Sequence, residues 1–168
     1  MSVLGNAMGK VIMICGKICS GKSFYAKSLT EHENAVIFST DEVTYDLTDN
    51  AQGENYDAFA KRVNAYLMKK AAEVAAVGCT VILDWGFWTE ADRKTASDYF
   101  REKDIAVQWH YIDVAPDRWK RNIAQRNERV LRGEGGSDFY VDDGLLRKVN
   151  ALFEIPSKED MDEWHILK

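Results

Sequence analysis

The sequence predicts an α/β fold in which helices flank a parallel sheet, and two observations carry this prediction. Apolar runs typical of buried strands alternate with segments of helical periodicity, in the order β-α-β-α-β-α-β. The chain has 168 residues, of which 46% are hydrophobic and 29% charged, the balance of one globular domain with a well-filled core. We therefore expect residues 1–168 to form a single three-layer domain.

The elements follow from the periodicity of apolar residues. The clearest helix lies at about 55–77, where apolar residues recur three or four positions apart before Gly78 ends the pattern. The helix at about 89–103 opens with Thr89 and Asp92 at the spacing of a capping box. We expect strands at 11–15, 35–39, 80–84 and 106–114, and helices at 21–32, 55–77 and 89–103.

The last third of the chain combines an arginine-rich helical segment with a glycine-rich stretch. Pro116 suits the first turn of a helix that continues toward Leu131, and it is followed by the glycine-rich stretch 133–138. This stretch follows a helix rich in arginine, so we expect a mobile lid at about 126–143. A last helix at about 142–153 and an edge strand at 164–167 complete the domain, and residues 1–9 are predicted to be a loose leader.

Composition excludes several classes of protein. No apolar run approaches the roughly 18 residues of a membrane span, and the N-terminus lacks the apolar core of a signal peptide. The three cysteines have no zinc-binding spacing, the three histidines show no metal or triad spacing, and free thiols fit a reducing cytoplasm. A formal net charge of −5 disfavours nucleic acid as a partner. No feature of the sequence indicates the oligomeric state.

The first strand leads into the pattern G-x-x-x-x-G-K-S, which is the Walker A motif. A strand, a glycine turn and a helix in this order aim backbone N–H groups and the positive end of a helix at a phosphate. The alternative is a glycine turn that contains Gly-Lys-Ser by chance. We predict that the loop binds a nucleoside triphosphate with Mg²⁺, with the Ser23 hydroxyl on the metal and Lys22 at the β- and γ-phosphates. The nucleotide contacts are expected from Gly16, Lys17, Ile18, Cys19, Ser20, Gly21, Lys22, Ser23 and Phe24.

Two aspartates follow strands of the predicted sheet. Asp41 lies just after the second strand, where a carboxylate can accept the proton of an attacking hydroxyl. Position alone equally allows a plain helix start, in which Ser39 and Glu42 form a capping box. Asp84 ends the strand 80–84, the usual place of a Mg²⁺ or acceptor ligand, although it also suits a turn.

Further side chains offer contacts to a phosphate or an acceptor. Arg93, one turn into the next helix, either reaches a phosphate or lies in solvent. Trp88 either lines an acceptor pocket together with its aromatic neighbours or belongs to the core. The arginine-rich helix supplies cations that could meet the charge of a transferring phosphoryl group, although most charged helix faces are simply solvated. Its basic residues are Arg118, Lys120, Arg121, Arg126, Arg129 and Arg132.

Together these features resemble the small P-loop kinases described as AAA-type predicted kinases, relatives of zeta toxin, chloramphenicol phosphotransferase and polynucleotide kinase. The resemblance runs from Val11 to about Asp160. It rests on the Walker A stretch, Ser39-Thr40-Asp41-Glu42, the segment Ile82 to Trp88 with Arg93, His110 to Val114 before the arginine helix, and Leu152-Phe153-Glu154-Ile155-Pro156.

The resemblance implies a P-loop NTPase fold and an ATP- and Mg²⁺-dependent kinase with a hydroxyl acceptor. It implies that Asp41 is the general base, that Arg126 or Arg121 stabilises the transferring phosphate, and that the segment around Pro156 lies near the adenine. Many relatives carry an arginine three residues after the base, where this chain has Thr44. A small acceptor is therefore expected ahead of a nucleic-acid 5′-hydroxyl.

Other functions remain open from the sequence. One is an ATP-binding or ATPase module without an acceptor, and another is a polynucleotide 5′-hydroxyl kinase. A GTPase is disfavoured because no D-x-x-G follows the Walker A stretch, although Ser157 to Asp160 loosely resembles the N-K-x-D guanine motif. The acceptor itself has no local motif.

Overall fold

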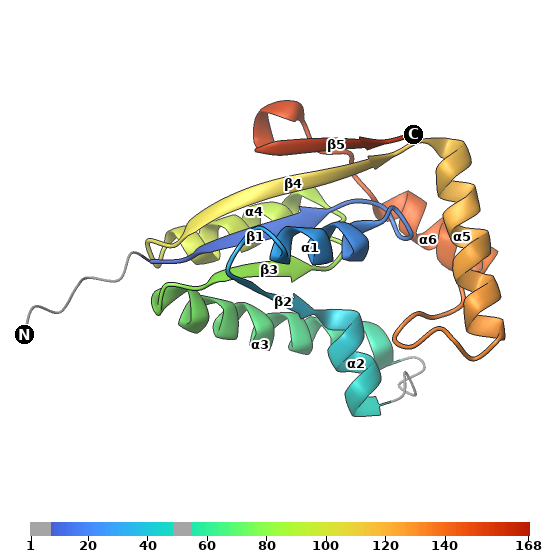
Figure 1. The fold of residues 1–168 in the computed structure, drawn as a ribbon, viewed down its shortest axis with the longest axis horizontal. Helices are drawn as coiled ribbons and strands as arrows, with labels where there is room; N and C mark the ends of the chain where they lie inside the picture. Colours follow the sequence, from blue (N-terminus) through green and yellow to red (C-terminus); the bar gives the residue numbers. More distant parts are fainter. Residues whose placement is uncertain (1–7, 49–54) are drawn as a thin grey trace, which may run out of the picture.

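A parallel sheet forms the centre of the molecule, whose computed structural model describes residues 8–48 and 55–168. Within these residues the five strands lie in the order β2-β3-β1-β4-β5 (Figure 1). All neighbouring pairs are parallel. The strands are β1 (Lys10–Cys15), β2 (Ala35–Ser39), β3 (Thr80–Asp84), β4 (Ala106–Val114) and β5 (Glu163–Leu167).

Helices cover both faces of the sheet, because the strand residues alternate between two apolar layers. Val11, Met13 and Leu83 pack toward α3 and α4, whereas Ile12 and Ile82 pack toward α1. The helices α2, α5 and α6 lie beyond the carboxyl ends of the strands (Figure 1). The helices are α1 (Lys22–Thr30), α2 (Thr40–Thr48), α3 (Tyr56–Ala76), α4 (Glu90–Arg101), α5 (Pro116–Leu131) and α6 (Asp143–Leu152), with a short 3-10 helix at Lys158–Asp160.

The predicted α/β architecture is confirmed, including the edge strand, which pairs with β4. Strand bounds agree within one residue, and the observed helices α1, α3, α4 and α6 are shorter than predicted by one or two residues at each end. The Thr89 capping box is present: Thr89 Oγ1 accepts from the Asp92 N–H at 3.0 Å, and Asp92 Oδ2 accepts from the Thr89 N–H at 3.3 Å. Helix α2 was predicted only as one alternative, a helix start at Asp41, and that start is present: Ser39 Oγ accepts a 3.4 Å hydrogen bond from the Glu42 N–H.

The predicted leader divides into two parts. Residues 1–7 lie outside the described residues. Gly9 is buried, its N–H donates to the Ala75 carbonyl at 2.8 Å, and an added Cβ would lie 2.0 Å from the Cys79 carbonyl oxygen. Gly9 therefore belongs to the packed domain, which corrects the prediction at that residue.

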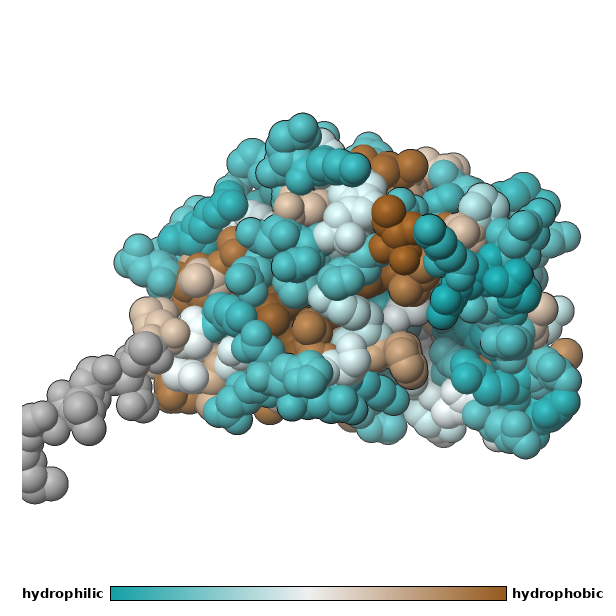
Figure 2. All heavy atoms as spheres, turned by 45° about the horizontal axis from the view of Figure 1, so that its top comes forward, coloured by the Kyte–Doolittle hydropathy of each residue, from teal (hydrophilic) through white to brown (hydrophobic). Residues whose placement is uncertain are grey.

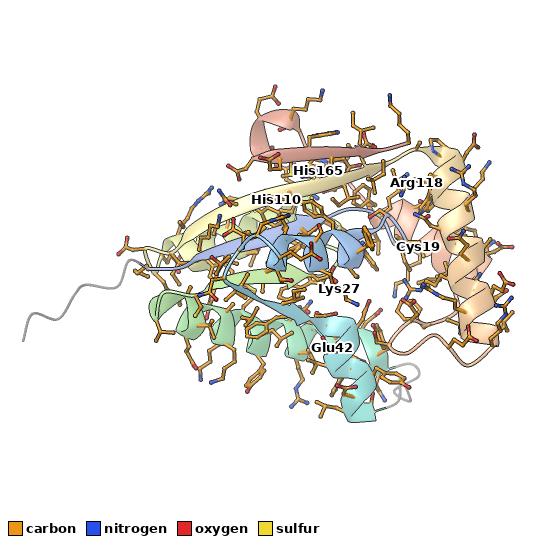
Figure 3. All side chains as sticks on the ribbon, viewed as in Figure 1. Cys19, Lys27, Glu42, His110, Arg118 and His165 are labelled. Atoms are coloured by element: carbon orange, nitrogen blue, oxygen red, sulfur yellow. The ribbon has the colours of Figure 1, made fainter. Side chains whose placement is uncertain are left out.

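Two of the histidines fasten α1 to the edge of the sheet. The Tyr25 hydroxyl lies 2.9 Å from His110 Nδ1 and 2.6 Å from His165 Nε2, and the labelled histidines lie on neighbouring strands in Figure 3. Burial lowers the pKa of His110 and raises the pKa of Tyr25 to about 12. The three side chains thus satisfy one another as a structural network.

The surface is mostly polar. On the face drawn in Figure 2, hydrophilic side chains dominate and apolar side chains appear in small separate patches. In the described part of the chain, no helix combines the length and the apolar character needed to cross a membrane.

Candidate active site

The loop between β1 and α1 is shaped for close approach of a ligand to its backbone. Gly21 precedes α1 with φ 100°, and no side chain caps the helix, so its first N–H groups stay available. A Cβ on Gly16 would lie 2.8 Å from Ser20 Oγ and 3.0 Å from the Ile112 carbonyl oxygen, which leaves room only for glycine. The uncapped N-terminus of α1 is therefore electrostatically suited to an anion.

Lys22 lies across this loop. Its Nζ donates to the carbonyl oxygens of Gly16 at 3.1 Å and Lys17 at 2.7 Å. Burial lowers the pKa of Lys22, and the carboxylates of Asp84 and Asp41 act in the opposite direction. A lysine held by loop carbonyls in this way stands ready to exchange them for phosphate oxygens.

Charged residues from distant parts of the sequence meet beside this lysine. Asp41, Asp84, Lys22 and Arg126 all line one groove of about 2240 Å³. The register explains the aspartates, because Ser39 at the end of β2 pairs with Asp84 at the end of β3. Burial raises the pKa of Asp41, while the charges of Arg126 and Lys22 lower it. These four side chains thus bring two cations and two carboxylates into one groove.

Three arginines of α5 line this groove, Arg118, Arg126 and Arg129, and the side chain of Arg126 is only 12% exposed against 57% for Arg129. Arg126 Nε donates to the Phe139 carbonyl at 3.1 Å and lies 3.3 Å from Asp138 Oδ1. Its guanidinium lies 4.5 Å from the centroid of the Phe139 ring, and Nη1 lies 3.7 Å from Cys19 Sγ. The Nη2 atom is buried and has no hydrogen-bond partner among the described residues. Such a donor costs free energy unless a ligand accepts from it.

The segment predicted as a lid, about 126–143, is fastened to α5 in this structure. The Asn127 side chain both donates to the Val141 carbonyl at 2.9 Å and accepts from the Val141 N–H at 2.7 Å. Arg129 Nη2 donates to Asp138 Oδ2 at 2.8 Å. These contacts hold the loop over the groove, and its mobility stays a prediction.

Helix α5 also braces the phosphate loop from its side. Trp119 Nε1 donates to the Ile18 carbonyl at 2.7 Å, and Asn122 Nδ2 donates to the Cys19 carbonyl at 2.9 Å. Figure 3 shows Cys19 next to this helix. Neither Trp119 nor Asn122 was predicted as a site residue, because no local pattern distinguishes them from other residues of an amphipathic helix.

Two predicted site residues lie elsewhere than expected. Arg93 is only 7% exposed, and its Nη1 donates to the Phe87 carbonyl at 3.0 Å and the Trp88 carbonyl at 3.4 Å. It therefore neither lies in solvent nor lines the groove, and it supports the loop after β3. Arg121 is exposed and does not line the groove. Pro156 is buried, and its place near the adenine stays a prediction.

Trp88 was predicted either to line an acceptor pocket or to belong to the core. It lines the groove and also packs against a small apolar cluster around Ile18. Its Nε1 is buried without a partner among the described residues. A Cβ on Gly86 would lie 2.0 Å from this nitrogen, so the glycine lets the indole lie on the backbone. Phe87 belongs to the core, as do Trp109 and Tyr111.

No pattern in the sequence marks Tyr56 as a site residue. Its hydroxyl donates to Asp41 Oδ1 at 3.2 Å, and it also lines the groove. Behind it, Thr40 Oγ1 donates to Asn64 Oδ1, which ties α2 to α3. Helical periodicity marks only the buried face of α3, so these polar contacts have no signal in the sequence.

The oxygen ligands suited to Mg²⁺ are present in the groove. Ser23, at the start of α1, is exposed, and the Asp84 carboxylate ends β3; both line the groove beside Lys22. No group of three His, Cys, Asp or Glu side chains arranged to bind a metal occurs within the described ranges. Hydroxyl and carboxylate oxygens fit Mg²⁺, which takes its remaining ligands from water and nucleotide phosphates.

Comparison with known proteins gives the family. The sequence matches a family described as an AAA domain over residues 11–156, so the chain belongs to this family. A search of curated proteins finds no match.

Solved structures share the fold at low sequence identity. A candidate kinase from Chloroflexus aurantiacus superimposes with a TM-score of 0.72 at 16% identity, over 95% of this chain and 88% of that one. A sugar kinase from Janibacter sp. gives 0.65 at 13% identity, over 95% and 84%. APS kinase CysC of Mycobacterium tuberculosis, in complex with AMPPNP and APS, gives 0.62 at 16%, over 95% and 88%. The chain therefore has the fold of the P-loop kinases.

Proposed function

We propose that this protein is an ATP- and Mg²⁺-dependent kinase that transfers the γ-phosphate to a hydroxyl of a small molecule. One observation carries the proposal: Lys22, Asp41, Asp84 and Arg126 share a single groove at the carboxyl ends of the strands. The family match, the kinase fold and the AMPPNP in the APS kinase structure support it.

Each side chain has a role in this reaction. The phosphate loop and Lys22 bind the β- and γ-phosphates, and the free Nη2 of Arg126 donates to the oxygens of the group in transfer. Asp41 accepts the proton of the acceptor hydroxyl as the new O–P bond forms and ADP leaves. Ser23 and Asp84 would hold Mg²⁺ directly or through water, and this ion neutralises phosphate charge when bound.

A small acceptor is favoured over a nucleic acid. Thr44 is fully buried, so this side chain is not available to a nucleic-acid phosphate. Acidic and basic side chains occur in nearly equal numbers in the lining of the groove, so the groove is not a basic track for a polyanion. The net charge of −5 likewise disfavours nucleic acid as the acceptor.

An acceptor screen tests the proposal. ADP release would be followed with nucleosides, sugars, antibiotics and 5′-hydroxyl oligonucleotides, each with Mg²⁺ and with excess EDTA. We expect ADP release to require both Mg²⁺ and one class of small acceptor. ADP release that is indifferent to every acceptor would favour the ATPase alternative, and release with the oligonucleotides alone would favour a polynucleotide kinase.

Two variants separate the donor and acceptor halves of the site. Asp41→Ala should abolish phosphotransfer and spare ATP binding, whereas Lys22→Ala should impair both. Asp117→Ala is the matched control, because Asp117 is likewise an acid in the first turn of a helix but lies outside the groove. Phosphotransfer near wild type in Asp41→Ala would show that Asp41 is not the general base.

A further inference from the structure

Tyr56 contacts the candidate base and the lid at the same time. It is the first residue of α3, and its hydroxyl donates to Asp41 Oδ1 at 3.2 Å. Burial and the neighbouring Asp41 charge raise the pKa of Tyr56. The phenol therefore keeps its proton at neutral pH and acts as a donor to the carboxylate.

The ring of Tyr56 contacts Phe139 in the lid segment, next to Arg126. It packs edge-on against Phe139, with ring centroids 6.4 Å apart and an interplanar angle of 66°. The same Phe139 ring lies 4.5 Å from the guanidinium carbon of Arg126, and the Phe139 carbonyl accepts from Arg126 Nε. A continuous set of contacts thus runs from Asp41 through Tyr56 and Phe139 to Arg126.

We propose that Tyr56 is a positioning residue that orients the Asp41 carboxylate and links it to the lid segment at Phe139. This inference rests on the proposed function, in which Asp41 accepts the proton of the acceptor. One carboxylate oxygen, Oδ1, is held by Tyr56, which leaves Oδ2 for the acceptor hydroxyl. Displacement of the lid moves Phe139 from the ring and loosens this arrangement, so the base is held best when Arg126 is also in place.

The Tyr56 hydroxyl also affects the pKa of Asp41. A hydrogen bond donated to a carboxylate favours its ionised form, so the Tyr56 hydroxyl lowers the pKa of Asp41 against the larger effect of burial. A tyrosine that served only for packing would leave the pKa of Asp41 unchanged when its hydroxyl is removed. This difference separates a positioning role from a structural one.

The first test is Tyr56→Phe, which keeps the ring contact with Phe139 and removes only the hydroxyl. NMR titration of the Asp41 carboxyl in the free protein should show a higher pKa than in wild type. With the acceptor found by the screen, kcat should fall roughly 3- to 10-fold, and the acid limb of the pH profile should move to higher pH. Tyr66→Phe is the control, since Tyr66 lies on the same helix but is 58% exposed.

The second test is Phe139→Leu, which keeps the Tyr56 hydroxyl and removes the aromatic contact. We expect a lower kcat with little change in the Asp41 titration, because the hydrogen bond to Oδ1 remains. An unchanged Asp41 pKa in Tyr56→Phe, or wild-type kcat in both variants, would overturn the inference. The NMR readout needs no acceptor, and full activity in Asp41→Ala would instead refute the proposed function, so the two failures are distinct.

Discussion

Replacing Asp41 with asparagine should slow the reaction and stabilise the fold at the same time. Burial raises the pKa of Asp41, and the nearby Asp84 adds to this effect, although Arg126 and Lys22 oppose it. Ionising this carboxyl in the native state therefore costs folding free energy. Asparagine removes the charge, keeps nearly the same shape, and still offers Oδ1 to the Tyr56 hydroxyl.

The two effects have different sizes. A general base contributes roughly 10²- to 10⁴-fold to the rate, so kcat should fall by that factor, or about 3–5 kcal/mol of barrier. Relief of a strained functional site commonly adds roughly 0.5–2 kcal/mol of stability. In a domain of this size each kcal/mol raises the melting temperature by about 2–4 °C.

The pH dependence identifies the cause of the stability gain. A carboxyl whose pKa is raised on folding weakens the fold at pH values above its folded pKa, and this penalty disappears as the pH falls through that pKa. The gain of Asp41→Asn over wild type should therefore be full above the folded pKa of Asp41 and shrink as the pH falls through that pKa. Thermal unfolding of both proteins across this range measures it.

A control variant and two outcomes decide this prediction. Asp117→Asn removes an exposed acid from the first turn of α5 and should change neither rate nor pH dependence. A less stable Asp41→Asn at neutral pH, or a difference that does not vary with pH, would refute the view that a buried charge is held there at a cost. Undiminished phosphotransfer would refute its role as base.

Two further predictions concern the arginine site and the core. Arg126→Lys keeps the charge but loses the guanidinium fork, so kcat should fall roughly 10²- to 10³-fold. Arg121→Lys, outside the groove, should stay close to wild type in the same assay. Equal losses of kcat in the two variants would contradict the assignment of Arg126. Phe100→Ala empties a fully buried position between α4 and the sheet and should lower the free energy of unfolding by about 3–5 kcal/mol, measured with denaturant. Leu131→Ala, at a side chain 76% exposed, should lower it by less than about 0.5 kcal/mol. A small loss of stability in Phe100→Ala would mean that the core refills the cavity.

The residues predicted well were those whose role depends on neighbours in the chain. The turn from Gly16 to Ser23 is built from consecutive residues, and the Thr89 capping box joins residues three apart. The strand that ends at Asp84 was predicted with its observed bounds, because a buried parallel strand is a continuous apolar run.

Predictions for single side chains on helices were weaker. Arg93 was expected at a phosphate or in solvent, but it turns back to the carbonyls of Phe87 and Trp88. Arg121 and Arg126 were equivalent candidates on one helix, and only the path of the following loop separates them, because it brings Phe139 onto Arg126 alone. A side chain's partner from another segment leaves no trace in local periodicity.

The sequence by itself determined the layered α/β fold, the position of the phosphate loop and the two strand ends that carry Asp41 and Asp84. It could do so because strand alternation, glycine turns and helix starts are local properties of the chain. Only the tertiary structure decided that Arg126 rather than Arg121 enters the groove, and that Tyr56 holds the candidate base. Those contacts join α2, α3, α5 and the lid, which meet only after the parallel sheet has brought its carboxyl ends to one edge.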